Sequence, residues 1–323
     1  KNMNFAVIGL GSFGVKRAKA IKSSKIAKLV CISDPDENNA KKAEKELDVP
    51  IKSFQEILNS KEIDVVSICA PNKFHKELII DSLKNDKHVF CEKPISRNFQ
   101  EAQDIFNSTK KYSKILQVGS NHRFFESVLH AKKLVDDGVI GKVLSFNGRI
   151  GHNGERLKDS WFWKKDISGG GTLLDNGCHL LDLSRYFIGN FVSGTGITSN
   201  TYWKNIEVED SASGVFKTED GRTASIFCSW RLLSGYFFFE LNGSEGYINV
   251  DGRFDTHGGD KIFWSTKKEG KIYNKDFSHL KPNSYQLEID NFVNNLKNNK
   301  PCSPNANDAL EVMRMIDFIY KNK

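Results

Sequence analysis

The 323-residue sequence predicts an α/β protein in which a doubly wound parallel sheet is followed by an α+β domain with a large, mainly antiparallel sheet. Residues 1–120 alternate short apolar runs with amphipathic stretches, which is the pattern of parallel strands connected by helices. After Gly119 this rhythm gives way to strand-like sequence rich in β-branched and aromatic residues. Because a domain runs to roughly 150 residues, the length allows about two domains. We therefore expect a first domain over residues 1–120 and a second over residues 121–323.

Composition and charge exclude several classes of protein. Hydrophobic residues make up 39% and charged residues 27% of the chain, which is ordinary for a globular protein and excludes wholesale disorder. No apolar run approaches the roughly 18 residues that cross a bilayer, and no signal-peptide stretch precedes the first strand, so we expect a cytoplasmic protein without a membrane partner. The net charge of +7 is spread along the chain as Lys rather than clustered as Arg, which argues against a nucleic-acid partner.

The first domain is expected to contain five strands and a shorter sixth. The strands are the apolar runs at residues 5–8, 29–33, 65–70, 89–91 and 115–118, with the short one near Ile51. Helix starts are indicated at Ser53 and Asn98, because each is followed three residues later by a Glu that can complete a capping box.

In the second domain, a helix at residues 126–137 is expected to end at Gly138 and to be followed by a strand, a glycine-rich segment and one apolar helix. Residues 191–264 are typical of antiparallel strands. Turns between these strands are predicted at residues 219–221, 242–243 and 258–259. Two final helices, at residues 285–296 and 306–320, carry apolar residues at helical spacing and are expected to pack on this sheet or on the first domain.

A glycine-rich turn follows the first strand. It has the G-x-G-x-x-G pattern in the strand-to-helix context that makes the pattern informative. Gly9 would allow a tight turn, Gly11 a close approach of backbone N–H groups to a pyrophosphate, and Gly14 close packing of helix on strand. The alternative is a purely structural turn. The expected cofactor contacts of this segment are Gly9, Gly11, Ser12, Phe13 and Gly14.

Asp34 lies twenty residues after Gly14, at the end of the second predicted strand. A carboxylate there can accept hydrogen bonds from a ribose 2′-hydroxyl and would repel a 2′-phosphate, which favours NAD over NADP as the cofactor. Lys41 and Lys42 follow, so a use of NADP stays open. Asp34 could also serve as a helix N-cap before Pro35.

Three further motifs occur in order along the chain. They are Ala70-Pro71-Asn72 with His75 after one strand, Glu92-Lys93-Pro94 after the next, and GGGTLLDNGCHLLD at residues 169–182 in the second domain. Together with the glycine loop they resemble the Gfo/Idh/MocA oxidoreductase family over nearly the whole chain, and the last two motifs are the most specific. The resemblance implies an NAD-binding Rossmann domain. Its further cofactor contacts are expected from Ala70, Pro71, Asn72, His75, Glu92 and Lys93.

Lys93 follows a strand at its carboxyl end, the edge of an open α/β sheet at which ligands bind. The resemblance implies that the Lys93–Pro94 peptide is cis and that Lys93 is catalytic. A nearby oxidised nicotinamide would lower the pKa of the Lys93 ammonium group and let it share or relay a substrate hydroxyl proton. The alternative is a surface Lys before a turn proline.

Asp175, His179 and Asp182 are spaced i, i+4 and i+7, so a helix would place all three on one face. Leucines surround them, so His179 could instead be a satisfied core histidine. Gly177 allows another group to approach closely, and a His with a carboxylate one turn earlier forms a proton-transfer pair. The resemblance implies that Asp175 binds a substrate hydroxyl and that His179 takes its proton. Asp182 is expected to orient His179 or to cap structure.

Further residues are expected to shape the substrate pocket. Asn121 and Arg123 open the second domain, and Arg123 could clamp a hydroxyl or an anion. Trp161 and Trp163 precede the glycine run, where an indole can stack on a sugar ring, although we expect apolar packing for at least one of them. Arg149 completes the predicted substrate set, and His122 and His152 are also expected to shape the pocket.

The motifs favour an NAD-dependent dehydrogenase or reductase that acts on a secondary hydroxyl of a polyol, sugar or sugar derivative, nucleotide-linked sugars included. His179 would accept the hydroxyl proton while Lys93 stabilises the alkoxide. The alternatives are a redox-assisted lyase or glycosidase and a non-catalytic dinucleotide sensor, and the intact set of Lys93, Asp175 and His179 weighs against the sensor.

Two partner predictions complete the sequence analysis. A zinc site built from His75, Asp175 and His179 is an alternative use of these residues, but the resemblance implies no metal. The resemblance also implies that the open face of the second domain's sheet forms dimers or tetramers, and an exposed apolar sheet face would otherwise be a liability. We therefore expect a homo-oligomer that binds a small-molecule substrate.

Overall fold

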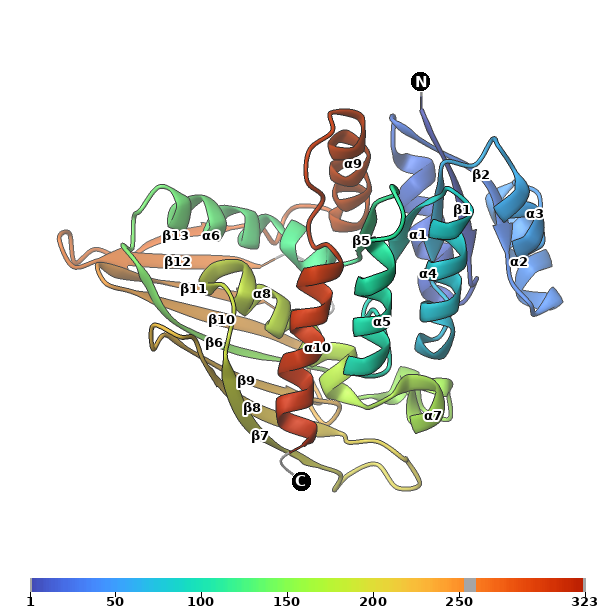
Figure 1. Cartoon of the computed structure of the whole chain (residues 1–323). Coiled ribbons are helices and arrows are strands. Elements are labelled where there is room, and N and C mark those ends of the chain that lie inside the picture. Colours follow the sequence, from blue (N-terminus) through green and yellow to red (C-terminus); the bar gives the residue numbers. More distant parts are fainter. Residues whose placement is uncertain (1, 253–259, 322–323) are drawn as a thin grey trace. The chain divides into compact units, whose positions relative to one another are not determined.

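The computed structural model describes residues 2–252 and 260–321 (Figure 1). The chain divides into two compact units. The first contains the residues up to Ser120 together with Tyr285–Leu310, and the second contains Asn121–Ser284 together with the residues from Glu311 onward. The break after Ser120 falls at the predicted boundary, whereas residues 285–310 group with the first unit and not with the predicted second domain.

The first unit contains a five-stranded sheet in the order β2-β1-β3-β4-β5, with every pair parallel. The strands are β1 (Met3–Ile8), β2 (Ala27–Ser33), β3 (Val65–Ile68), β4 (His88–Cys91) and β5 (Leu116–Val118). The predicted doubly wound sheet is confirmed. The predicted short strand near Ile51 is wrong, because Ile51 forms only an isolated bridge to Ile32. Pro50 has no N–H to extend this bridge, and Ser53 already caps the next helix.

Helices connect and cover these strands. They are α1 (Ser12–Ser23), α2 (Glu37–Leu47), α3 (Phe54–Asn59), α4 (His75–Lys84), α5 (Phe99–Thr109) and α9 (Ser284–Lys297), with the 3₁₀ turn η1 (Asn72–Phe74) before α4. Ser53 and Asn98 are N-caps as predicted, and Ser53 forms a complete capping box with Glu56. Residues 285–310 belong to this unit because Phe292 and Val293 of α9 are fully buried in the same apolar cluster as Phe5.

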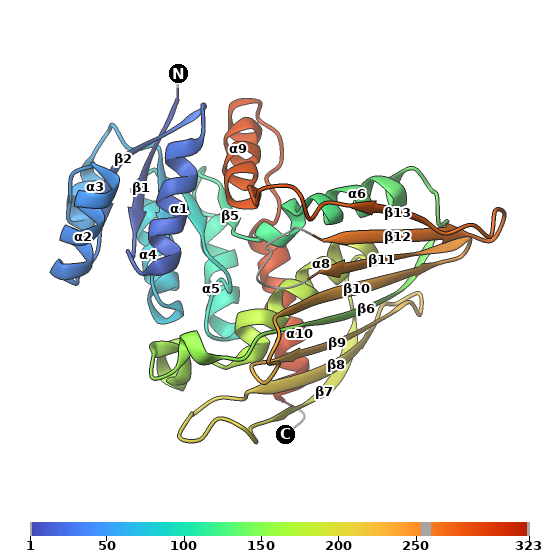
Figure 2. The same cartoon turned by 180° about the vertical axis from the view of Figure 1, so that it is seen from behind.

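The second unit contains an eight-stranded sheet in the order β13-β12-β11-β10-β6-β9-β8-β7 (Figure 2). The strands are β6 (Val143–Gly151), β7 (Ser193–Ser199), β8 (Ser211–Lys217), β9 (Thr223–Ser229), β10 (Tyr236–Gly243), β11 (Gly246–Gly252), β12 (Lys261–Thr266) and β13 (Tyr273–Asp276). The sheet is mainly antiparallel, as predicted, but β6 and β9 pair in parallel.

The predicted turns have different outcomes. The turn at residues 219–221 lies between β8 and β9, and Gly221 has a φ of +86°. The turn predicted at residues 242–243 is wrong, because these residues end β10 and the chain reverses at 244–245. Gly243 serves a close approach instead, since a Cβ added there would lie 2.0 Å from the Ile140 carbonyl oxygen. The turn predicted at residues 258–259 lies outside the described residues.

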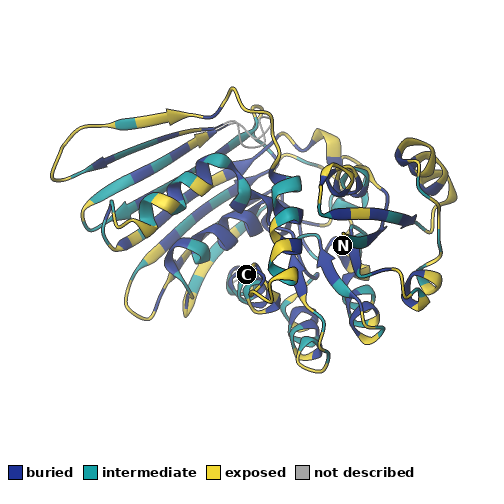
Figure 3. Cartoon of the chain, turned by 90° about the horizontal axis from the view of Figure 1, so that it is seen from above, coloured by how far each residue is buried: buried dark blue, intermediate teal, exposed yellow. Residues whose placement is uncertain are grey.

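The second unit contains the helices α6 (Glu126–Asp136), α7 (Lys165–Ser168) and α8 (Cys178–Ile188), with 3₁₀ turns η2 (Asn121–Phe124), η3 (Glu155–Leu157) and η4 (Trp161–Trp163) and a π-helical turn η5 (Leu173–Gly177). Helix α10 (Ala306–Tyr320) begins in the first unit, and its residues from Glu311 onward belong to the second. Helix α8 packs on β6, and α6 packs on β11 and β12. Burial alternates along β8 and β9, so one face of the sheet is covered and the other is open (Figure 3). Within the described residues, no helix combines the length and apolarity needed to cross a lipid bilayer.

Candidate active site

The turn between β1 and α1 has the backbone that its glycines predict. Gly9 has a φ of +86°, a left-handed conformation that favours glycine, and a Cβ added there would lie 2.6 Å from the Ala70 nitrogen. A Cβ on Gly14 would lie 1.8 Å from the Gly9 carbonyl oxygen. Gly9 therefore allows the turn to pack closely on the segment after β3, and Gly14 allows α1 to pack closely on the turn.

Gly11 differs from the other two glycines, because a Cβ added there would meet no described atom within 4 Å. Gly11 is the N-cap of α1, a helix that has no side-chain cap and no acidic residue in its first turn. The positive end of α1, at Ser12 and Phe13, is therefore open to an anionic ligand. A pyrophosphate fits this turn.

The carboxylate of Asp34 borders the same turn. Its Oδ2 accepts a hydrogen bond from the Leu10 amide at 2.6 Å, and its Oδ1 accepts one from the Asp36 amide at 2.8 Å. The N-cap of α2 is Asp36, whose side chain accepts hydrogen bonds from the amides of Asn38 and Asn39. The alternative in which Asp34 caps this helix is therefore wrong. Asp34 remains partly exposed beside the glycine turn, where a ribose hydroxyl can reach it.

His75 joins the segments that follow β3 and β4. Its Nδ1 lies 2.9 Å from the carbonyl oxygen of Pro94, and its Nε2 lies 2.7 Å from that of Ala70. The side chain is fully buried, and this burial lowers the pKa of His75. Because both ring nitrogens face carbonyl oxygens, His75 braces the two segments and is not placed to bind zinc. The loop residues Pro71 and Asn72 lead from Ala70 into η1.

Glu92 is held by an arginine that sequence reasoning missed. Its Oε1 accepts hydrogen bonds from Nε of Arg17 at 2.9 Å and from Nη2 at 2.6 Å. Arg17 is fully buried in α1, and its Nη1 lies 2.8 Å from Oε2 of Glu288 on α9. Burial raises the pKa of Glu288 to about 7, although Arg17 opposes the rise. The available signal was a basic residue on the apolar face of α1. This ion-pair network fixes the residue that precedes Lys93.

Lys93 is half-buried and follows β4 at its carboxyl end. The Lys93–Pro94 peptide is cis, as the resemblance implies. Lys93 therefore lies at the edge of the parallel sheet that also carries the glycine turn, which is the edge where open α/β sheets bind their ligands.

Asp175 lies in the π-helical turn η5 and not in a regular α-helix as predicted. Its Oδ2 accepts a hydrogen bond from Nε1 of the fully buried Trp230 at 3.1 Å and lies 3.6 Å from Nε2 of His152. The Gly154 amide donates to Nδ1 of His152 at 2.9 Å, so a neutral His152 carries its proton on Nε2, facing Asp175. Sequence reasoning missed Trp230, whose only signal was its place after a predicted strand.

His179 and Asp182 extend from α8 toward η2. The His179 ring lies against that of His122, with centroids 3.7 Å apart and the ring planes tilted by 31°. Asp182 accepts hydrogen bonds from Arg123 at 2.7 Å and 2.6 Å in a buried bidentate ion pair. Asp182 therefore binds Arg123, whereas the sequence predicted that Asp182 orients His179 or caps structure. The Arg123 guanidinium, which was predicted to clamp the substrate, is paired with Asp182.

Arg149 departs from its predicted substrate role. It is exposed on β6, whereas a Cβ on the neighbouring Gly148 would lie 2.9 Å from Leu180 of α8. Because side chains alternate along a strand, Arg149 points to the sheet face opposite α8 and the helix that carries His179. Its guanidinium lies over the rings of Phe227 and Tyr236.

The two tryptophans and Asn121 have different surroundings. Trp163 is buried in an apolar cluster with Trp230, which is the packing role expected for at least one of the pair. Trp161 stacks on its neighbour Phe162, with centroids 3.9 Å apart. Asn121 is buried at the start of η2.

The structure thus gathers the predicted residues into one set in each unit. The first unit brings the glycine turn, Asp34, His75, Glu92 and Lys93 to one edge of its parallel sheet. In the second unit, Asp175 meets His152, which follows β6, and Trp230, which follows β9, and the nearby His179 of α8 meets His122 of η2. No group of three His, Cys, Asp or Glu side chains able to hold a metal ion occurs within residues 2–252 and 260–321.

An open helix terminus with a partly exposed carboxylate beside it is typical of dinucleotide-binding α/β proteins. Two family models match this chain: the oxidoreductase family with an NAD-binding Rossmann fold over residues 3–120, and the GFO/IDH/MocA C-terminal domain over residues 128–249. The chain belongs to the GFO/IDH/MocA oxidoreductase family.

Several characterised proteins are similar to this chain. A myo-inositol 2-dehydrogenase of Thermotoga maritima is 30% identical over 95% of this chain and 92% of the relative. A 2,7-anhydro-N-acetylneuraminate hydratase of Escherichia coli (strain K12) is 30% identical over 82% of this chain and 72% of the relative. A levoglucosan dehydrogenase in complex with NADH and levoglucosan has the same fold, with a TM-score of 0.90 and 22% identity over 100% of this chain and 97% of that one.

Proposed function

We propose that this protein is an NAD-dependent dehydrogenase that oxidises a secondary hydroxyl of a polyol, sugar or sugar derivative. The observation that carries the proposal is the buried cluster around Asp175, in which a carboxylate is held by the Trp230 indole and faces His152. Burying a carboxylate costs free energy that an apolar side chain at the same place would not cost. A buried carboxylate with polar partners therefore indicates a functional role. The similarity to the myo-inositol 2-dehydrogenase of Thermotoga maritima supports a polyol or sugar as the substrate.

Each unit contributes its own residues to the reaction. When bound, NAD would supply a nicotinamide ring that accepts a hydride from the substrate carbon. The open end of α1 would hold the pyrophosphate, and Asp34 the ribose. Asp175 would accept a hydrogen bond from the substrate hydroxyl and orient it, and the imidazole of His179 would take the hydroxyl proton. The ammonium group of Lys93 would stabilise the negative charge that develops on the substrate oxygen.

A panel of polyols, free sugars, nucleotide-linked sugars and sugar acids tests this proposal, with NAD and NADP and the absorbance of the reduced cofactor as the readout. On the best substrate, K93A and H179A are each expected to lower kcat by about 10²–10⁴-fold, the range of general acid–base catalysis. K84A, which removes an exposed lysine at the end of α4, is the matched control. Wild-type turnover in both K93A and H179A, with unchanged NAD binding, would contradict the proposed roles.

A redox-assisted elimination or hydration is the second candidate, because a hydratase is among the relatives at 30% identity. In such a reaction the substrate is oxidised transiently and the cofactor is returned to its starting state. Product would then form without accumulation of NADH. Chromatographic analysis of the panel, with catalytic amounts of NAD, distinguishes the two reactions.

We also propose that the open face of the eight-stranded sheet forms a homodimer or homotetramer. Ile197 of β7 is 72% exposed and Val215 of β8 is 53% exposed, so two adjacent strands present apolar side chains. The double variant I197E/V215E is expected to lower the mass measured by light scattering to that of a monomer. L233E, at a residue that is 88% exposed outside the strands, is the control. A monomeric wild-type protein would contradict this proposal.

A further inference from the structure

One residue occupies the start of the helix that carries Asp175. Oε1 of Glu209 accepts hydrogen bonds from the amides of Gly171 and Leu173, each at 3.0 Å. The carbonyl oxygen of Glu209 accepts a third from the Thr172 amide at 3.1 Å. A helix leaves its first N–H groups without partners inside the helix. Here three successive amides are all satisfied by Glu209, which comes from a different part of the chain.

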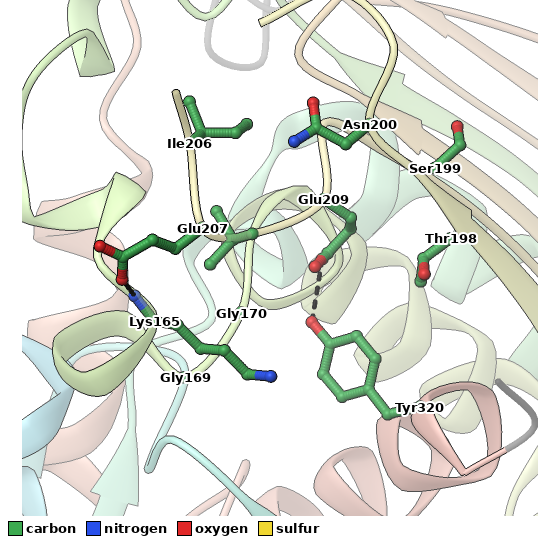
Figure 4. A pocket seen from close by; sticks show the side chains of 11 residues that line it. Lys165, Gly169, Gly170, Thr198, Ser199, Asn200, Ile206, Glu207, Glu209 and Tyr320 are labelled. Atoms are coloured by element: carbon green, nitrogen blue, oxygen red, sulfur yellow. Dashed lines mark hydrogen bonds between the residues drawn. The ribbon is translucent and has the colours of Figure 1, made fainter. Parts of the chain in front are cut away.

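Tyr320, the last residue of α10, completes this arrangement. Its hydroxyl donates a hydrogen bond to the same Oε1 of Glu209 at 2.9 Å (Figure 4). A Cβ added to Gly170 would lie 2.0 Å from the Tyr320 hydroxyl oxygen, and one added to Gly171 would lie 1.9 Å from the Glu209 carbonyl oxygen. Two glycines of the run are therefore required by contacts with Glu209 and Tyr320, and not by the approach of a ligand.

The same segment reaches Asp175 by two short paths. The carbonyl oxygen of Gly171, whose amide is bonded to Glu209, accepts the hydrogen bond of the Asp175 amide at 3.0 Å. The Trp230 amide donates to the carbonyl oxygen of Asp210 at 2.8 Å, and the Trp230 indole donates to the Asp175 carboxylate at 3.1 Å. The backbone and the side chain of Asp175 are thus both anchored through residues 209–210.

We propose that Glu209 and Tyr320 are positioning residues that fix the Asp175 carboxylate for the reaction. They touch neither substrate nor cofactor and act through the π-helical turn. The inference rests on the role given to Asp175 under the proposed function. Glu209 is 7% exposed, and burial raises its pKa, so water competes only weakly for its contacts with two amides and a hydroxyl.

A cavity beside this arrangement offers a way to test it. The cavity has a volume of about 500 Å³ and is lined by Glu209 and Tyr320 together with Lys165, Asn200, Gly169 and Gly170 (Figure 4). A small carboxylate from solution can therefore reach the place of the Glu209 carboxyl when that side chain is shortened. Glu207 lines the same cavity, but its carboxylate accepts a hydrogen bond from the Lys165 amide and lies 3.5 Å from Nζ of Lys164, which makes it a matched control.

The test measures kcat/KM on the best substrate of the panel and the Kd of NAD. E209A is expected to lower kcat/KM about 100-fold, the effect of a misplaced catalytic group, with an unchanged Kd for NAD. Sodium formate should then raise the kcat/KM of E209A about tenfold, because it replaces a charge-assisted hydrogen bond. Sodium chloride at equal ionic strength should leave the kcat/KM of E209A unchanged. Y320F should lower kcat/KM about fivefold, because it removes one hydrogen bond to Glu209 and leaves the carboxylate in place. E207Q should match the wild type.

The outcomes separate this inference from the proposed function. If D175N keeps wild-type turnover, the role of Asp175 is wrong and the proposed function fails. If D175N is inactive while E209A and Y320F both keep wild-type kcat/KM, only the positioning role fails. If E209A does not fold, Y320F decides the question, because the Phe retains the ring that packs against Gly170. A loss in E209A without formate rescue, accompanied by weaker NAD binding, would indicate general damage and overturn the proposal.

Discussion

The two glycine-rich turns of this protein look alike in sequence and differ in what surrounds them. In the first, a Cβ on Gly11 would meet no described atom within 4 Å, and no side chain caps α1. In the second, Oε1 and the carbonyl oxygen of Glu209 take three successive amides, and a Cβ on Gly171 would lie 1.9 Å from Glu209. In the first turn, the helix N-terminus has no side-chain cap and can accept an anionic ligand. In the second, the protein's own Glu209 carboxylate accepts the amide hydrogen bonds.

Buried carboxylates also accompany the first turn, but they bind a side chain instead of the amides. Glu92 and Glu288 are both paired with Arg17, which follows Gly14 in α1. The arginine neutralises these carboxylates and leaves the terminus of α1 open. A glycine motif therefore indicates only that a close approach is allowed, and the neighbouring charged groups decide whether the approaching group is a ligand or the protein itself.

The largest effect is expected from G171A. Its Cβ would overlap the backbone of Glu209, which cannot move aside as a flexible side chain would, so the free energy of unfolding should fall by about 3 kcal/mol. Urea denaturation followed by tryptophan fluorescence measures this change. G11A, which adds the same atom to the open turn, should leave the free energy of unfolding nearly unchanged. Equal stability of the two variants would remove the distinction between the turns.

The second prediction concerns the pH dependence of stability through Glu288. Its pKa in the folded protein is about 7, above its ordinary value of 4.5, because burial disfavours the charged form. Between these pH values the folded state binds more protons than the unfolded state, so stability is lost as the pH rises through this window, and below it the group contributes no pH dependence. Relative to E288Q, the wild type should lose about 2 kcal/mol from pH 4.5 to 7.

Denaturant titrations of both proteins across this pH range provide the measurement for Glu288. Glu44, an exposed carboxylate on α2, gives the control variant E44Q, which should follow the wild-type curve. A difference between wild type and E288Q that does not change with pH would show that Arg17 keeps Glu288 charged throughout.

The third prediction is that G11A binds NAD about tenfold more weakly than the wild type, because its methyl group would enter the space that a pyrophosphate needs, a loss of about 1.4 kcal/mol. Fluorescence titration with NADH measures the affinity. The control is L233E, which alters an exposed loop residue and should bind NADH normally. Normal binding by G11A would place the cofactor away from this turn.

Much of the fold could be predicted because its signals are local in sequence. Ser53 and Asn98 start helices through contacts with residues three positions away, and the glycine turn carries its chemistry within six residues. The strands of the first unit are short apolar runs whose burial on both faces leaves a clear pattern. The parallel pairing of β6 with β9 has no such signal, since register between distant strands depends on the packing of the whole sheet.

The surroundings of Asp175 could not be predicted for the same reason. Glu209 and Trp230 come from distant segments that packing brings to the π-helical turn, whereas His152 was expected near the pocket but not beside Asp175. The sequence also did not predict the π-helical turn, because the apolar pattern of Leu173 and Leu174 is compatible with an α-helix as well as a π-helix. The resemblance to a family predicted the candidate catalytic residues, but the groups that hold Asp175 in place follow from tertiary contacts.

The smallest expected effect concerns the choice between NAD and NADP at Asp34. Asp34 already accepts the Leu10 amide of the open turn, and its negative charge would repel a 2′-phosphate at a partly exposed position. Two unit charges near a protein surface interact by a few kcal/mol at most, and exposure reduces this further, so D34A should change the NADP-to-NAD ratio of kcat/KM by about fivefold in favour of NADP. D36A, which alters the cap of α2 two residues away, should leave the ratio unchanged. Because the repulsion is electrostatic, the difference between D34A and wild type should shrink when the salt concentration is raised, and a difference that is independent of salt would assign the preference to the shape of the turn instead.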